Sequence, residues 1–261
     1  MRRSSPHVEK IQDQFTRQAD AYSRMQQTRD EKGLRGLVAL AAISNSDRVV
    51  DVACGPGFLT MAFAEKCEHV LGVDATGEFL RRARREADSR HIHNIAFAPG
   101  DANHLDLEDG TFDCASCRAA FHHFPDPARV LGEMRRVVRP GGKILVADML
   151  ASRDPEQASL HNRIEKLCDP THTRALADTE FEQLFREAGL EVLQRPTSKI
   201  HYELEEWLGH GGPNEEAARE IRRLFEASLD DDRSGLKVRR EGKDLKFTHQ
   251  AAAFLLRTPT A

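Results

Sequence analysis

The segment from Arg48 to Thr60, Arg-Val-Val-Asp-Val-Ala-Cys-Gly-Pro-Gly-Phe-Leu-Thr, constrains the fold more than any other part of the chain. A buried apolar strand ends there in a turn built on Gly55 and Gly57, and a helix follows at once. Glycine lets the backbone turn tightly and lets a ligand approach the main chain. The first N–H groups of the helix have no partner within it, so they can bind polar ligand atoms. This pattern predicts a ligand site at the strand end, although loops of this kind also bind dinucleotides.

Strand and helix patterns alternate up to about residue 150. Apolar runs predict strands over 49–53, 69–74, 95–99, 112–117 and 143–148, and helical spacing predicts helices over 58–66, 76–89 and 127–139. This order predicts parallel βαβ units with right-handed crossovers. Ligands of such sheets bind at the carboxyl ends of the strands. We therefore expect the functional residues to follow these strands.

The segments that flank this region do not show the regular alternation of strands and helices. Residues 8–44 have a helical pattern, and after residue 150 we expect helices over 155–167, 179–189 and 214–229, a strand over 191–202 and a terminal hairpin over 236–256. A capping box from Thr179 to Glu182 is expected to start the second of these helices. The predicted organisation is an N-terminal helical lid (1–35), a core (36–150) and a C-terminal part (151–261) that completes the sheet and covers the substrate, all in one compact domain.

Composition excludes several classes of protein. The net charge of -4 does not suit a nucleic-acid partner, and no apolar run approaches the roughly 20 residues that span a bilayer. Five cysteines, an odd number, and the lack of an apolar stretch after Arg2-Arg3 predict a reduced, cytoplasmic protein. We expect neither nucleic acid nor membrane as a partner, and the oligomeric state stays open.

Several motifs together resemble the class I S-adenosylmethionine (SAM) dependent methyltransferases. They are Asp51-Val-Ala-Cys-Gly-Pro-Gly57, Gly72-Val-Asp74, Gly100-Asp101-Ala102, Phe112-Asp113, Phe121-His-His-Phe124 and Val138-Arg-Pro-Gly-Gly142. The resemblance covers most of the chain and is strongest to the UbiE/YcgJ-like subgroup. It implies an α/β fold with a doubly wound, mostly parallel, seven-stranded Rossmann-like sheet and helices on both faces. One departure is Ala53, which replaces the first glycine of the usual pattern.

The resemblance also implies the cofactor, SAM, with S-adenosylhomocysteine as its product. The implied SAM site comprises Asp51, Ala53, Cys54, Gly55, Pro56, Gly57, Asp74, Ala75, Phe79, Gly100, Asp101, Ala102, Arg118 and Ala119. Within it, Asp74 would accept both ribose hydroxyls, Phe79 would lie against the adenine, and Asp101 would accept its amino group. These assignments predict a methyltransferase that acts on a small-molecule acceptor by in-line transfer.

His122 and His123 are the predicted catalytic residues. Histidine titrates near neutral pH and can take a proton from a phenol, enol or amine. The alternative is that one histidine packs under the loop and hydrogen-bonds the backbone. Both are also expected to contact substrate, together with Tyr22, His172 and Arg174.

Other readings remain open. The chain could bind SAM with altered or lost methyl transfer. A nicotinamide-dependent oxidoreductase is disfavoured, because Thr60 stands where its third glycine or alanine belongs. The sequence does not say whether oxygen, nitrogen, carbon or sulfur is methylated.

No metal site is expected from the sequence. Cys114 and Cys117 lie three apart on a strand, so they should point to opposite faces. His91 and His93 have no further ligand cluster near them in the sequence. We therefore expect no metal ligands among these residues, and we expect Cys114 and Cys117 to be small residues of the apolar core.

Overall fold

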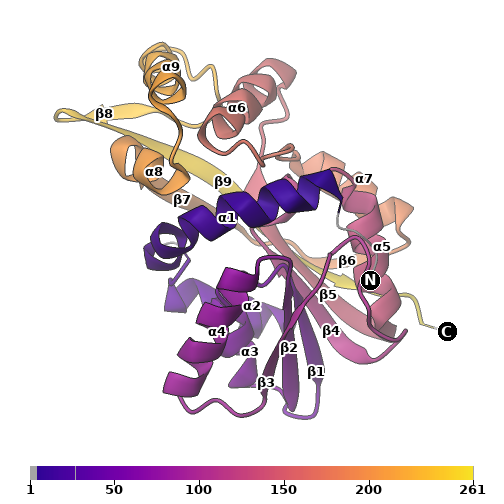
Figure 1. Ribbon diagram of the computed structural model, residues 1–261. Coiled ribbons are helices and arrows are strands. Elements are labelled where there is room, and N and C mark those ends of the chain that lie inside the picture. The colour runs from indigo at the N-terminus through magenta and orange to yellow at the C-terminus, as the bar shows by residue number, and fades with distance from the viewer. Residues whose placement is uncertain (1–4, 27, 261) are drawn as a thin grey trace.

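The computed structural model describes residues 5–26 and 28–260, and within them nine strands form one sheet (Figure 1). Seven strands follow the order β3-β2-β1-β4-β5-β9-β6, and β7 and β8 also pair with β9. The strands are β1 (Arg48–Val52), β2 (His69–Asp74), β3 (Ile95–Pro99), β4 (Phe112–Arg118), β5 (Val138–Leu150), β6 (Glu191–Gln194), β7 (Thr197–Glu203), β8 (Arg239–Glu241) and β9 (Asp244–Arg257). The first five strands are parallel, and β9 is antiparallel to β5. The mostly parallel, seven-stranded Rossmann-like sheet is confirmed, with β7 and β8 as additions.

Helices cover both faces of this sheet, as predicted. They are α1 (Pro6–Arg24), α2 (Glu31–Ala41), α3 (Phe58–Ala64), α4 (Gly77–Ser89), the 3-10 turn η1 (Phe121–His123), α5 (Pro127–Val137), α6 (Pro155–Cys168), α7 (Asp178–Glu187), α8 (Leu204–Gly211) and α9 (Glu215–Glu226). Helices α2 and α3 bury Val38 and Phe63 against one face, and α5 and α7 bury Met134 and Phe185 against the other. Burial of apolar surface on both faces explains the continuous apolar strands of the sequence.

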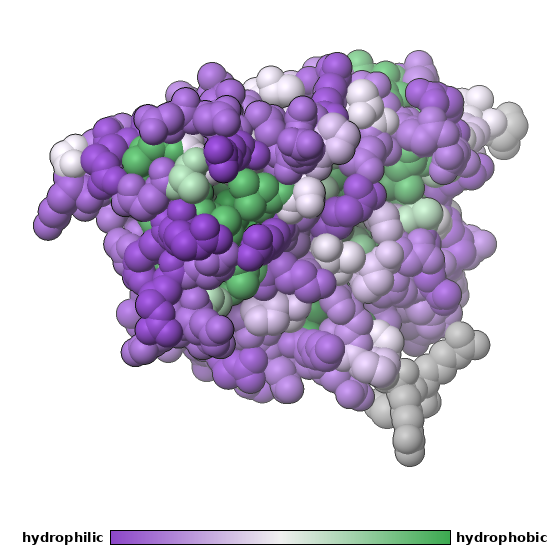
Figure 2. All heavy atoms as spheres, turned by 90° about the horizontal axis from the view of Figure 1, so that it is seen from above, coloured by the Kyte–Doolittle hydropathy of each residue, from purple (hydrophilic) through white to green (hydrophobic). Residues whose placement is uncertain are grey.

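A second group of elements lies above the carboxyl ends of the parallel strands. Helices α6, α8 and α9 pack with the outer part of β9 around Ile164, Trp207, Phe225 and Phe247. Helix α1 crosses the strand ends between this group and the core (Figure 1). Seen from above, the surface is mostly hydrophilic, with hydrophobic residues in limited patches (Figure 2). None of the described helices is long and apolar enough to cross a membrane.

Three local predictions differ from the structure. The strand expected over 191–202 is two strands, β6 and β7, because Pro196 between them has no N–H to donate. The capping box at Thr179 is wrong: α7 starts at Asp178, and Glu180 instead accepts the N–H of Ala177. The hairpin is shorter at its first strand than expected, because Lys237 has a positive φ of 52° just before β8.

Candidate functional site

The turn after β1 takes a backbone conformation that favours glycine. Gly55 and Gly57 have φ values of 54° and 79°, and Ala53 has a φ of 54°. A Cβ on Gly57 would lie 2.9 Å from side-chain atoms of both Ala83 and Phe97. Gly57 is therefore required for close packing of the turn, whereas Ala53 holds a conformation that costs an L-residue roughly 1–2 kcal/mol.

The carboxylate of Asp74 connects this turn to the start of α4. Its Oδ2 accepts the N–H of Gly55 at 2.8 Å, and its Oδ1 accepts the N–H of Thr76 at 2.7 Å. Burial raises the pKa of Asp74, and the two backbone N–H groups oppose that effect. An ionised carboxylate has about four acceptor positions, so two remain for ligand hydroxyls.

Asp51 lies at the floor of the site, between β1 and β4. Its carboxylate accepts the hydroxyls of Thr60 and Ser116, each at 2.7 Å. Burial raises the pKa of Asp51 to about 6, although these hydroxyls partly oppose the shift. Asp51 thus fixes the start of α3 to the end of β4 beneath the cavity.

A cavity of about 990 Å³, open solvent at its mouth included, occupies the carboxyl edge of the sheet. It brings together nearly all of the predicted SAM-site residues: Asp51, Ala53, Cys54, Gly55, Pro56, Asp74, Ala75, Phe79, Gly100, Asp101, Ala102, Arg118 and Ala119. Gly57 alone of the predicted set is outside the lining, since it packs against Ala83 and Phe97 instead.

Helix α1 forms the cover of this cavity. The rings of Phe15 and Tyr22 lie 5.7 and 5.4 Å from that of Phe79, and all three line the cavity. The helix is fastened to the core, because Nε2 of Gln12 donates to the carbonyl of Ala75 at 2.9 Å. Tyr22 was predicted at the site, but Phe15 was missed. The helical spacing of the two residues, seven apart, could have revealed Phe15.

His122 forms a buried pair with Asp148 at the end of β5. Its Nδ1 lies 2.6 Å from Oδ1 of Asp148, and its backbone N–H donates to Oδ2 at 3.2 Å. Burial by itself lowers the pKa of His122, but the charge and hydrogen bond of Asp148 outweigh it and raise the pKa. Asp148 was not predicted, and its hydrogen bonds to the ring and the backbone N–H of His122 fix the orientation of that histidine.

The surroundings of His123 and His172 lower the pKa of each ring, whereas those of His122 raise its pKa. Burial, with a further contribution from the charge of His122, lowers the pKa of His123 to about 4 and that of His172 to about 3. His123 lines the cavity, and its ring meets that of Phe15 at 5.2 Å. His172 stacks on His122 at 5.6 Å and binds Asn162 through Nε2. The lowered pKa of His123 argues against its titration near neutral pH.

The structure separates the predicted substrate residues. Tyr22 and His123 line the cavity, whereas His122 and His172 lie outside its lining. Arg174 also lies outside the lining: its exposed guanidinium binds Glu180 at 2.5 Å, and its backbone N–H donates to the carbonyl of His122. This placement gives no support to the predicted substrate contact of Arg174.

The cysteines behave as core residues. Cys114 and Cys117 point into the apolar clusters on opposite faces of the sheet. Burial raises the pKa of Cys114 to about 12 and that of Cys117 well above its usual value. Both cysteines therefore belong to the apolar core, each on its own side of the sheet.

Several proteins similar to this chain are named methyltransferases. A family model described as "Methyltransferase domain" matches residues 50–146. The uncharacterized methyltransferase YcgJ of Bacillus subtilis (strain 168) is 28% identical over 209 residues, which cover 79% of this chain and 82% of that protein. A demethylmenaquinone methyltransferase of Deinococcus radiodurans is 34% identical over 121 residues, covering 45% of this chain and 50% of that protein. The crystal structure of a candidate methyltransferase from Bacillus halodurans C-125 has a TM-score of 0.83 and 27% identity, covering 87% of this chain and 99% of that one.

Proposed function

Because the chain belongs to the class I SAM-dependent methyltransferases, we propose that it methylates a small-molecule acceptor at the carboxyl edge of its sheet. One observation carries this proposal. The glycine turn, Asp74 and Asp101 converge in a single cavity that α1 covers with aromatic side chains. The cavity supplies polar groups at its core side and apolar rings at its cover, as a nucleoside-type cofactor beside a small organic acceptor requires.

The residues present fit SAM. Asp74 would hold the ribose hydroxyls, because its carboxylate is already oriented by Gly55 and Thr76 and keeps free acceptor positions. Phe79 would contact the adenine, and Asp101 would accept its amino group, since its Oδ1 is fixed by Asn103 at 2.9 Å. When bound, SAM supplies a methyl group already activated by its sulfonium.

The chain's own task is alignment and exclusion of water. Tyr22 and His123 are proposed to contact the acceptor, because both line the cavity below α1. Holding reacting atoms in line can supply up to about 7–11 kcal/mol of a barrier. The pKa of His123 is lowered to about 4, which favours its neutral form at pH 7, so its ring can accept a hydrogen bond from the acceptor.

His122 has a different proposed role. Its Nδ1 lies 2.6 Å from Oδ1 of Asp148, and this hydrogen bond fixes the orientation of the His122 ring beside His123. The backbone carbonyl of His122 accepts N–H groups of Thr173 and Arg174, which fixes this loop over the strand ends. His122 is thus a positioning residue for the acceptor side.

We also propose that α1 acts as the lid, residues 36–150 as the SAM-binding core and residues 151–261 as the remaining cover. The boundary at residue 35 falls inside α2, which packs on the core, so the lid is α1 alone. Within the described residues, α1 is hydrogen-bonded both to the core and to the C-terminal part. Gln12 donates to the carbonyl of Ala75, and Gln18 donates to that of Gly211 at the end of α8.

A two-step experiment tests the proposal. SAM and S-adenosylhomocysteine should raise the melting temperature by mass action, and NAD and NADP should not. A metabolite library is then incubated with isotopically labelled SAM, and products are detected by mass. Binding of SAM with no methylated product from any small molecule would favour the alternative of altered chemistry, and transfer only to a macromolecule would refute the acceptor class.

A further inference from the structure

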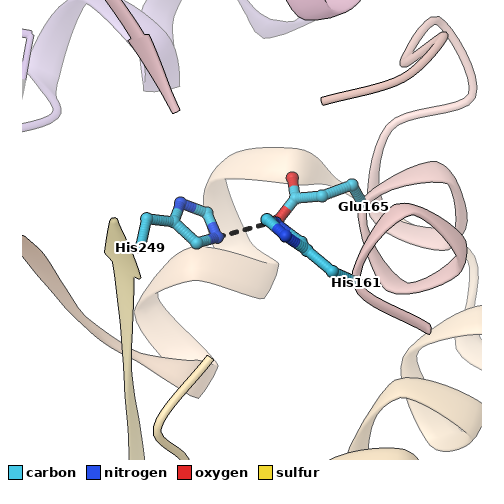
Figure 3. Close-up of side chains that lie close together, drawn as sticks. All are labelled: His161, Glu165 and His249. Carbon is cyan, nitrogen blue, oxygen red and sulfur yellow. Dashed lines mark ion pairs between the residues drawn. The ribbon is translucent and has the colours of Figure 1, made fainter. Parts of the chain in front are cut away.

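Three polar side chains outside the cavity converge between α6 and β9. His161 and Glu165 stand one helical turn apart on α6, and His249 faces them from β9 (Figure 3). His161 and His249 are each 2% exposed and Glu165 is 6% exposed. One possible ligand atom from each of the three residues lies within 4.8 Å of the corresponding atoms of the other two. The three side chains therefore point at one common position.

The Nε2 atoms of both histidines and Oε1 of Glu165 have no hydrogen-bond partner within residues 5–26 and 28–260. The surroundings of His249 are aromatic, with the rings of Tyr202 and Phe247 at 5.1 and 5.2 Å. A buried polar atom without a partner costs about 1–3 kcal/mol, so three of them at one place are unfavourable. Their convergence favours a ligand shared by all three side chains.

The spacing matches that of ligands around a small cation. Oε1 of Glu165 lies 2.9 Å from Nε2 of His249 and 3.7 Å from Nε2 of His161. Two ligand atoms each about 2.1 Å from a metal are separated by ~3.0 Å at a right angle and by ~3.4 Å at a tetrahedral angle. The observed distances bracket these values, so small side-chain shifts would complete a coordination sphere.

We propose that His161, Glu165 and His249 bind a divalent first-row transition-metal ion such as Zn²⁺. Two imidazole nitrogens and one carboxylate oxygen suit Zn²⁺, Fe²⁺ or Mn²⁺, whereas Ca²⁺ and Mg²⁺ prefer oxygen ligands alone. Three protein ligands leave at least one position for water or another small ligand. The ion would tie α6, from the cover, to β9, from the sheet.

The proposed metal site is connected through α6 to the loop that packs against His122 and His123. Helix α6 leads directly into the loop that carries Thr171 and His172. In that loop, the hydroxyl of Thr171 lies 3.3 Å from Nδ1 of His123, and the ring of His172 stacks on His122. A metal that fixes α6 would therefore help to hold this loop in place.

A simple ion pair is the competing arrangement. Protonated His249 beside Glu165, 2.9 Å away, would need no metal. That arrangement satisfies two of the three atoms and leaves Nε2 of His161 buried without a partner. Metal binding by the intact chain separates the two arrangements.

The test measures metal binding by the full chain after removal of any affinity tag. We expect one equivalent of Zn²⁺ per chain in a competition titration with a chromophoric chelator, and d–d absorption bands when Co²⁺ is used instead. His249→Gln and Glu165→Gln should each weaken Zn²⁺ binding by about 100-fold or more. Loss of a residue that only hydrogen-bonds a metal ligand already costs about 10- to 100-fold in affinity, and loss of a ligand should cost at least as much. The matched control is His201→Gln on the adjacent β7, whose Nδ1 lies 2.9 Å from the hydroxyl of Thr248; it should bind like the wild type.

Two outcomes would overturn the metal site. One is the absence of stoichiometric Zn²⁺, Mn²⁺, Fe²⁺ or Co²⁺ binding by the wild-type chain. The other is binding that persists in His249→Gln and Glu165→Gln, which would place the ion elsewhere. If both variants fail to fold, the Co²⁺ titration of the wild type decides alone. None of these measurements uses turnover, so a failure here is distinct from a failure of the proposed methyl transfer.

Discussion

The N–H of Gly55 donates to Oδ2 of Asp74 across 2.8 Å, and this bond joins the ends of β1 and β2 at the floor of the cavity. The same carboxylate accepts the N–H of Thr76, so it organises the turn before any ligand is bound. Preorganised acceptors lose little freedom on binding, which favours affinity. The cofactor site is therefore assembled by a residue that is also proposed to contact the cofactor.

Asp74→Ala should weaken S-adenosylhomocysteine binding by about 1.5–3 kcal/mol, the range for hydrogen bonds to a charged group. It should also lower the stability of the ligand-free chain, because two buried N–H groups lose their acceptor. Isothermal titration and denaturant unfolding measure the two effects. Asp106→Ala, an exposed residue, is the control. Wild-type affinity in a folded Asp74 variant would reject its assigned role.

Ala53→Gly should stabilise the chain by about 0.5–1 kcal/mol. The positive φ of Ala53 costs an alanine more than it costs glycine, and this gain exceeds the added entropy of the unfolded state. Ala75→Gly, in the same cavity without a positive φ, should instead destabilise by about 0.5–1 kcal/mol. Urea unfolding compares the pair, and equal destabilisation by both would show that Ala53 is unstrained.

The pair of His122 and Asp148 should make stability depend on pH. Because its folded-state pKa is raised above 6.5, His122 contributes stability that is fully present below pH 6.5 and is lost as pH rises through the folded pKa. Asp148, with its pKa lowered from 3.8, contributes stability above pH 3.8 that is lost as pH falls through its folded pKa. The charges of Glu165 and Asp169 act on His122 in the same direction as that of Asp148.

Asp148→Asn tests this linkage. Without the charge of Asp148, burial should dominate and lower the pKa of His122. The difference in unfolding free energy between wild type and Asp148→Asn should therefore be larger at pH 6 than at pH 8.5. Unfolding curves at several pH values measure it. A difference that does not change with pH would mean that His122 is neutral in the folded chain.

His123→Ala should lower turnover by about tenfold or more, a loss of at least about 1.4 kcal/mol of barrier stabilisation. Its affinity for S-adenosylhomocysteine should stay within about threefold of the wild type, or about 0.7 kcal/mol, because the ring lies on the acceptor side. Arg174→Ala is the matched control and should turn over at wild-type rates, since its guanidinium binds Glu180 at the surface. Rates of labelled product formation compare the variants, and an unimpaired His123→Ala would move the acceptor elsewhere.

Local signals in the sequence were sufficient to predict the strands, turn and helices of the Rossmann-like core. The apolar run, glycine turn and helix start between Arg48 and Thr60 are encoded within a few residues, because turn chemistry and hydrophobic periodicity act over short range. The parallel order then places Asp74 and Asp101 at one edge, since the carboxyl ends of parallel strands lie together. For the same reason the structure gathers nearly all of the predicted SAM-site residues in one cavity.

Only the tertiary structure decided which neighbouring residues share an environment. His122 and His123 are adjacent in sequence, but the 3-10 turn directs one to Asp148 and the other into the cavity. The partner of Arg174 likewise depends on where α7 docks. His249 meets Glu165 and His161 across more than eighty residues because β9 returns to the sheet beside α6. Such contacts depend on the packing of whole elements, and no local period or turn signal records them.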